Sequence, residues 1–439
     1  MFKRRITYLA IVSVALCVFM AIVVITVMTG LLTEFKDKNH KWFGDCIIST
    51  DSLVGFSDYQ QFFEILSKKD SVAAFSPVIK SYALISAKGS DRNRPIEILG
   101  IEPVSFAAVT DFENMLYYHK GDTSAAFEPP YDVNLPGCIL GIDMAIERDE
   151  HGKYTHEPQP SYAAFEISCF PLTAKGALAK AELGLVSSKT FYYSDDCHSG
   201  LAKVDGDIVY LPFEQAQQLC GMDGDSERIT AIYIKFNDGT NIESATGEIK
   251  KIWNVFVISK KDTASAQLLK NVKVETWKEY NRAAIAAVET EQIMMIFSFM
   301  FIGVISVFIV FVVFYMIVSR KRKDIGILKS IGVSKSNTVA IFLLFAFLVG
   351  SLASALGIFA GVLFLNKINS FEAWLYNHFG FQLWNRTMYA IDQIPNQIDL
   401  TVVAVIVLSA IIACLTGAFV PACQAAKMQP VDALQVNQL

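Results

Sequence analysis

Long apolar runs at the two ends of the chain dominate its hydrophobic pattern. A helix needs about 20 apolar residues to cross the roughly 30 Å hydrocarbon core of a bilayer. Four stretches reach that length, at residues 6–28, 292–318, 339–365 and 398–420, and Asp399 is the only charged residue in them. Nothing comparable lies between the first two. The pattern predicts a membrane protein with one N-terminal and three C-terminal transmembrane helices, and a large soluble domain inserted between helices 1 and 2.

Residues 29–291 have the pattern of an extracytoplasmic α+β domain. Short alternating or β-rich runs predict strands, and Gly and Pro separate them every 10–20 residues. The first of these strands is expected to break at Pro77. The expected strands are residues 72–85, 96–101, 139–140, 207–211 and 231–236, with helices at 142–148 and 213–219.

Both edges of this domain predict helical stalks. Residues 32–42 keep a helical spacing until Gly44, and no Gly or Pro interrupts residues 277–298. One face of the second stalk is defined by Trp277, Tyr280, Ala284 and Val288. We expect both membrane helices to continue outward as rigid stalks that transmit motion. The alternative is a pair of short surface helices with breaks at the bilayer.

Flanking basic residues set the expected orientation. Lys3, Arg4 and Arg5 precede the first helix, and the loop at 319–338 is strongly basic. That loop contains Arg320, Lys321, Arg322, Lys323, Lys329 and Lys335 against the single acid Asp324. We therefore expect residues 1–5, 319–338 and 421–439 to be cytoplasmic. The domain and the short loop 366–397 are expected outside.

Composition adds two restrictions. The 439 residues are 53% hydrophobic and only 18% charged, with a mean hydropathy of +0.37, whereas soluble proteins are about 25% charged. Residues 29–291 contain 26 basic and 38 acidic residues, which argues against nucleic acid as a partner.

A cleaved signal peptide is disfavoured for residues 6–28, because this run exceeds the usual h-region of about 7–15 residues.

No catalytic or metal-binding constellation stands out. The sequence lacks a phosphate-binding G-x-x-x-x-G-K-[ST] loop, an H-E-x-x-H and a G-x-S-x-G motif. Asp195, Asp196, Cys197 and His198 resemble a ligand cluster, but a polar loop is the favoured interpretation, because no second group completes the site. Five of the eight cysteines fall in the domain, an odd number without a C-x-x-C motif, so neither a disulfide nor a metal site is predicted. The chain is not expected to be an enzyme, and the lack of ionisable residues inside the spans disfavours ion-driven transport.

Small residues predict a close helix contact in the third span. Gly350, Ser354, Gly357 and Gly361 lie on one helical face and include a G-x-x-x-G motif. The partner helix could belong to this chain or to a second copy. The alternative is the ordinary frequency of glycine in membrane helices.

The basic loop contains the pattern of a short amphipathic helix. Ile325, Leu328 and Ile331 recur at helical spacing, with Lys323 and Lys329 off that stripe and Gly332 placed to cap the end. Such a helix could lie on the membrane surface or insert into a groove of a cytoplasmic partner.

Several segments resemble the FtsX-like ABC transporter permease family, which includes macrolide-exporter and lipoprotein-releasing membrane subunits. Residues 324–334 are similar to the family's coupling segment, and residues 421–434 are similar to its C-terminal ending, with Pro-Val-x-Ala-Leu at the end. The one-plus-three helix layout is also the family's. The segments most similar to the lipoprotein-releasing branch are residues 27–30 with Phe35, 96–103 and 209–219.

The resemblance implies a bacterial inner-membrane permease with a MacB-like periplasmic domain, acting by mechanotransmission. Family members dimerise with a second copy or a paralogue, and a separate cytoplasmic ABC ATPase subunit binds ATP and Mg. In the lipoprotein-releasing branch a lipoprotein leaves the bilayer and passes to a periplasmic carrier, but residues 173–185 lack the hook of the carrier-recruiting member. The implied ATPase-coupling residues are Asp324, Ile325, Gly326, Leu328, Lys329, Ile331 and Gly332.

Two other functions remain open from the sequence. One is an exporter-type permease for peptides or drugs, and the other is a transmembrane regulator of cell-wall hydrolases.

Overall fold

The computed structural model describes residues 2–90, 92–149, 154–178, 186–223, 227–261, 266–380 and 393–429. They form two compact units. The helical unit consists of residues 2–33, 286–380 and 393–429, and the sheet unit consists of residues 34–285. Each unit is described by itself.

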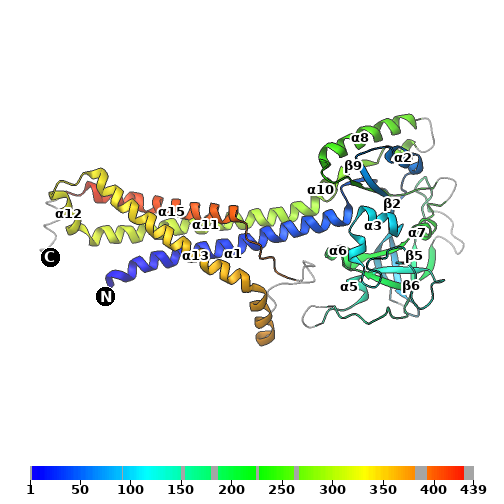
Figure 1. The fold of residues 1–439 in the computed structure, drawn as a ribbon, viewed down its shortest axis with the longest axis horizontal. Coiled ribbons are helices and arrows are strands. Elements are labelled where there is room, and N and C mark those ends of the chain that lie inside the picture. The colour runs from blue at the N-terminus through cyan, green and yellow to red at the C-terminus, as the bar shows by residue number, and fades with distance from the viewer. Residues whose placement is uncertain are drawn as a thin grey trace. The chain divides into compact units, whose positions relative to one another are not determined.

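Long apolar helices build the helical unit. Among the described residues, four helices are long and apolar enough to cross a membrane, and they pack around a shared apolar core (Figure 1). In chain order, one precedes the sheet unit and three follow it, as predicted. These helices are α1 (Phe2–Phe43), α11 (Arg282–Arg320), α13 (Lys335–Phe379) and α15 (Leu400–Lys427), with the short α12 (Arg322–Ser330) between α11 and α13.

Two of the helices end later than predicted. The prediction of a loop at residues 366–397 is wrong for its first part, because helix α13 continues to Phe379. No Gly or Pro interrupts this extension until Gly380, which ends the helix at a φ of 64°. Helix α15 continues through Pro421 to Lys427, since a proline inside a membrane helix removes only one main-chain donor and neighbouring helices compensate for it.

One mixed sheet forms the sheet unit. Nine strands of the described residues pair in the order β3-β7-β4-β6-β5-β2-β8-β1-β9, and β2 also pairs with β3. That extra pairing closes six strands into a small barrel, with β8, β1 and β9 extending from it. The strands are β1 (Cys46–Ser49), β2 (Val72–Ala87), β3 (Arg94–Ile101), β4 (Gly137–Gly141), β5 (Ala164–Cys169), β6 (Ser187–Cys197), β7 (Ile208–Pro212), β8 (Ala231–Phe236) and β9 (Lys273–Thr276).

The long strand β2 makes this closure possible, and its predicted break at Pro77 is wrong. Residues up to Val78 pair with β8, and residues from Val78 onward pair with β3. The Val78 carbonyl accepts a hydrogen bond from the N–H of Thr230, in the segment leading into β8, so the main-chain nitrogen of Pro77 points away from β8. The ladder with β3 begins at Val78, so no hydrogen bond to β3 requires the N–H that Pro77 lacks.

Helices pack against the sheet in two apolar clusters. Trp253 of α8 packs edge-on against Phe56 and Phe62 in the apolar cluster that also fills the closed sheet. A second cluster includes Phe106, Phe112 and Tyr210. The helices of this unit are α2 (Tyr59–Leu66), α3 (Pro103–Val109), α4 (Phe112–Met115), α5 (Ile142–Ala145), α6 (Ala202–Asp207), α7 (Phe213–Leu219), α8 (Ile242–Ser259), α9 (Ala266–Leu269) and α10 (Trp277–Tyr280).

Candidate functional site

Helix α12 is the amphipathic helix expected in the basic loop. Lys321 and Asp324 form an ion pair of 2.6 Å at its start. Ile325 is buried in a small cluster with Val318 and Ala425. This cluster attaches α12 to the C-terminal ends of α11 and α15.

The three predicted stripe residues do not share one buried face. Ile325 is 3% exposed, whereas Leu328 is 44% exposed and Ile331 is 76% exposed. Ile331 lies just beyond the last helical residue, Ser330. The exposed pair, together with Ile327, leaves an apolar surface on a basic helix.

The end of α12 has the cap that the sequence predicted. Gly332 takes a φ of 97°, a backbone conformation that glycine adopts at little cost. Its N–H donates to the Lys329 carbonyl, and the Val333 N–H donates to the Leu328 carbonyl, which is the Schellman pattern. Ser334 then accepts from the Asn337 N–H and starts α13.

Lys329 ties α12 to the end of α15, a contact that the sequence did not indicate. Its Nζ donates to the carbonyl oxygens of Ala426 and Met428, at 2.7 and 2.6 Å. Ala426 lies in the last turn of α15 and Met428 directly follows its last residue, Lys427, where main-chain carbonyls have no partners within the helix. A cation at this end of a helix is also favoured by the helix dipole. An exposed helix is thus fixed directly to a membrane-spanning one.

The predicted small-residue face makes contacts within the chain. A Cβ on Gly357 would lie 2.8 Å from the Ala15 carbonyl oxygen, and one on Gly361 would lie 3.2 Å from Ile22 Cγ2. Both contacts join α13 to α1. A Cβ on Gly350 would instead lie 3.2 Å from Cys414 Cβ of α15, and Ser354 is buried. The alternative of mere glycine frequency does not account for these close approaches.

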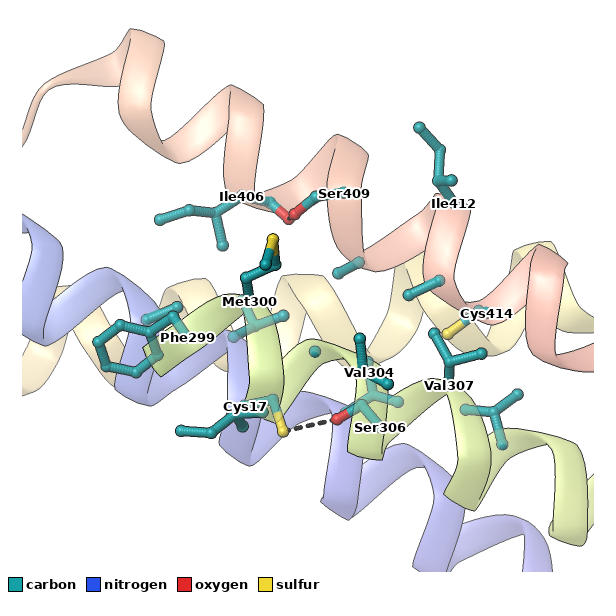
Figure 2. Close-up of a pocket in the computed structure, with 18 of the residues that line it drawn as sticks. Cys17, Phe299, Met300, Val304, Ser306, Val307, Ile406, Ser409, Ile412 and Cys414 are labelled. Carbon is teal, nitrogen blue, oxygen red and sulfur yellow. Dashed lines mark hydrogen bonds between the residues drawn. The ribbon is translucent and has the colours of Figure 1, made fainter. Parts of the chain in front are cut away.

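An apolar pocket of about 480 Å³ lies among α1, α11 and α15. Figure 2 shows that Cys17 of α1 and Ser306 of α11 point toward each other, with a Sγ–Oγ distance of 2.8 Å. Ser409 and Thr416 donate to carbonyls of their own helix, so the pocket offers hydrocarbon rather than free polar groups. Among its other lining residues are Val14, Val18, Phe299, Met300, Val304, Ile406, Ile412 and Ala413. No sequence pattern indicated this pocket, because every span is apolar throughout.

The prediction that the second stalk is one continuous helix is wrong. Helix α10 ends at Tyr280, and α11 begins at Arg282. Between them, the Asn281 side chain and N–H both bond the Trp277 carbonyl, an asparagine behaviour that competes with helix continuation. Trp277 is buried against His40, with ring centroids 4.9 Å apart.

The other stalk residues are divided between the two units. Tyr280 packs against Phe43 of the sheet unit, with ring centroids 5.1 Å apart. Val288 lies on α11 in the helical unit. By contrast, α1 is unbroken from Phe2 to Phe43 and ends at Gly44, as predicted for the first stalk.

The acidic cluster is a buried network and not the expected polar loop. Asp195 and Asp196 lie in β6 and are fully buried. Asp195 accepts hydrogen bonds from the N–H groups of residues 117–119, and its carboxylate lies 3.0 Å from His119 Nδ1.

The second aspartate of the network is partnered as well. Asp196 accepts from the Tyr193 hydroxyl and lies 3.1 Å from His156 Nε2. Burial raises its pKa, and the bonds from His156 and Tyr193 oppose that rise. In the described part of the chain, no three His, Cys, Asp or Glu side chains are grouped to hold a metal, and this network links β6 to residues 117–119 and to His156.

Comparison with known proteins supports the resemblance. Residues 295–430 match the family model described as FtsX-like permease C-terminal. The chain is 24% identical over 443 residues to the lipoprotein-releasing system transmembrane protein LolC of Neisseria meningitidis serogroup B, covering 99% of this chain and 95% of that protein. It is 22% identical over 440 residues to LolC of Xylella fastidiosa, covering 99% and 96%.

Solved structures are similar at a lower level. The periplasmic region of MacB from Actinobacillus actinomycetemcomitans is 13% identical, with a TM-score of 0.30 over 56% of this chain and 94% of that one. The extracellular domain of the noncanonic ABC-type transporter YknZ from Gram-positive bacteria is 9% identical, with a TM-score of 0.28 over 53% and 98%.

The resemblance to FtsX-like ABC transporter permeases is therefore confirmed by the family model and by the full-length likeness to LolC. Residues 430–434 of the C-terminal motif and residues 179–185 of the segment compared with the carrier hook lie outside the described residues.

Proposed function

We propose that this chain is the membrane subunit of an ABC transporter that releases lipoproteins from the bacterial inner membrane. A separate cytoplasmic ATPase subunit binds ATP and Mg and pushes on α12. The permease works as a dimer with a second copy or a paralogue and transmits the movement to its periplasmic domain. The observation that carries this proposal is the fixing of an exposed helix, α12, to the spanning helix α15 by Lys329.

The surface of α12 suits a protein partner that delivers force. Leu328 and Ile331 are exposed, and burying such side chains in a groove stabilises a helix-in-groove contact. Ile325 and Lys329 hold the opposite side on the bundle. A push on the exposed side is therefore passed to α15 rather than lost in a loose loop.

The apolar pocket suits an acyl chain of the substrate. Moving an acyl chain from lipid into an apolar protein pocket changes its surroundings little, because lipid tails are as apolar as the pocket. Moving it into water costs about 0.8 kcal/mol for each CH₂. Entry from the bilayer therefore needs no energy source, whereas release does, and ATP hydrolysis by the partner subunit supplies it.

The proposal is tested by reconstituting the permease with its ATPase subunit and following release of a radiolabelled lipoprotein from spheroplasts or proteoliposomes. Leu328→Glu places a charge on the exposed surface of α12, so we expect at least a tenfold loss of ATPase association and of release. Ser336→Glu adds the same charge at another exposed position, in the first turn of α13, and is expected to behave as wild type.

A second arm of the same experiment examines the pocket. Ala413→Phe fills the pocket from α15, so release is expected to fall while ATPase association is retained. Leu408→Phe adds the same ring at a position 61% exposed on that helix and is the matched control. Normal association and release in Leu328→Glu contradicts the coupling role, and release that is as high in Ala413→Phe as in Leu408→Phe contradicts the acyl site.

A further inference from the structure

Two cysteines of the sheet unit lie side by side. The sulfur atoms of Cys169 and Cys220 are 3.9 Å apart, and the two residues are 1% and 3% exposed. Cys169 ends β5, and Cys220 caps α7. The other three cysteines of this unit, Cys46, Cys138 and Cys197, are buried at separate places in its core.

The backbone on both sides of this pair is held in place. The Leu172 N–H donates to the Cys220 carbonyl at 3.3 Å. The Arg228 guanidinium donates to the carbonyls of Leu172 and Gly221, at 2.8 and 2.5 Å. Gly221 has a φ of 68° and fits against Pro171. The segment after β5 and the segment after α7 are thus fixed to each other independently of the two sulfur atoms.

The electrostatic environment distinguishes Cys169 from the other cysteines of this unit. A hydrogen bond from Cys220 lowers the pKa of Cys169 to about 7 against the opposing effect of burial. Burial raises the pKa of Cys46 to about 12 and raises that of Cys197 well above its usual value. The two sulfur atoms therefore interact directly in the folded domain.

We propose that Cys169 and Cys220 form a disulfide that staples α7 to the end of β5. The proposal rests on the proposed function in one respect, the placement of the sheet unit in the oxidising periplasm. The bridge closes a loop between positions 51 residues apart. That loop contains β6, β7 and α6, so the bridge restricts a large part of the domain.

The oxidant is a protein disulfide of the thiol oxidoreductase class. The Cys169 thiolate attacks one sulfur of that disulfide and expels the other sulfur as a thiolate, which gives a mixed disulfide. The Cys220 thiolate then attacks the Cys169 sulfur and expels, as a thiolate, the oxidant sulfur bonded to it. The two cysteines lose two electrons and two protons, and the oxidant becomes a dithiol. Because both sulfur atoms are buried in the folded domain, this exchange takes place before α7 closes against β5.

The test is disulfide mapping of the full-length chain. Cells are quenched with acid, free thiols are alkylated in denaturant without reductant, and the chain is digested and analysed by mass spectrometry. We expect a linked peptide pair containing Cys169 and Cys220 that disappears after reduction, while the other cysteines are alkylated. Cys138→Ser is expected to retain the bridge.

Thermal unfolding in detergent gives a second measurement. Reduction is expected to lower the unfolding midpoint of the wild type by several degrees and to leave that of Cys169→Ala/Cys220→Ala unchanged. Alkylation of both cysteines in the native chain overturns the proposal, and so does a bridge that appears only after an added oxidant. Reduced thiols together with normal lipoprotein release reject only the disulfide, whereas a native bridge without lipoprotein release rejects only the proposed function.

Discussion

The contact of Gly357 with α1 leads to a prediction about the stability of the helical unit. In Gly357→Ala the new Cβ would lie 2.8 Å from the Ala15 carbonyl oxygen and 2.8 Å from Val18 Cβ. The carbonyl is main chain, so it moves only if α1 moves with it. Overpacking of this kind costs about 1–3 kcal/mol, which exceeds the gain of up to about 1 kcal/mol from replacing a helical glycine by alanine.

Two other glycines provide matched controls for this substitution. A Cβ at Gly361 would meet side chains and no main-chain atom, Ile22 at 3.2 Å and Phe19 at 3.9 Å, and a Cβ at Gly303 would meet no atom within 4 Å. We therefore expect Gly303→Ala to be neutral or stabilising and Gly361→Ala to be close to wild type. Thermal unfolding of the full-length chain in detergent should show the midpoint of Gly357→Ala lowered by roughly 2–10 °C. If Gly357→Ala unfolds at the same temperature as Gly303→Ala, the reasoning from this close contact is refuted.

Two further predictions concern polar contacts. Lys329→Met removes both hydrogen bonds to the end of α15. Because hydrogen bonds to charged groups contribute about 1.5–3 kcal/mol each before discounting for partial exposure, amide hydrogen exchange in the last turn of α15 should become faster. Lys323→Met, at an exposed position, is the control, and equal exchange rates in the two variants argue against the cap. At Asp45, burial disfavours the ionised form, but hydrogen bonds from His40 and the Phe236 N–H outweigh it and lower the pKa. Its stabilising effect is therefore complete above the usual pKa of 3.8 and is lost as the pH falls through the lower pKa of the folded state. The difference in unfolding midpoint between wild type and Asp45→Asn should therefore be constant from about pH 6 to about pH 4 and shrink below about pH 4. A difference that stays constant at lower pH contradicts the assignment.

Local periodicity predicted the four membrane helices and five of the nine strands of the described residues, whereas β1, β5, β6, β9 and the long helix α8 were not predicted. Residues 213–219 and 231–236 were expected as a helix and a strand, and α7 and β8 have those bounds. These segments are delimited by Pro212 and by the Asn-Asp-Gly turn after Phe236, so the signal lies within a few residues of each boundary. The four membrane helices were predicted for the same reason, because their apolar length is a local property.

Contacts between distant segments could not be predicted in this way. The partners of Asp195 and Asp196 include residues 117–119 and His156, which no spacing rule connects to β6. The sequence showed four polar residues in a row and favoured a loop, whereas the fold buries three of them in a strand. The contacts of Lys329 could not be predicted either, because its partners Ala426 and Met428 lie 97 and 99 positions away in the sequence.

The close contacts of the helical unit form a continuous series that the proposed mechanism requires. Lys329 fixes α12 to the end of α15. On α15, Gly417 lies against the Val307 carbonyl of α11, where a Cβ would be 2.7 Å away, and Cys414 lies against Gly350 of α13. Gly357 then joins α13 to α1. Because a packed interior rearranges between discrete arrangements rather than deforming smoothly, a displacement of α12 has to move these helices together. Disturbing a contact far from α12, as the overpacking in Gly357→Ala does, should therefore lower lipoprotein release for each ATP hydrolysed without weakening ATPase association. Removing the Lys329 bonds in Lys329→Met should reduce release because the movement of α12 is then not passed to α15.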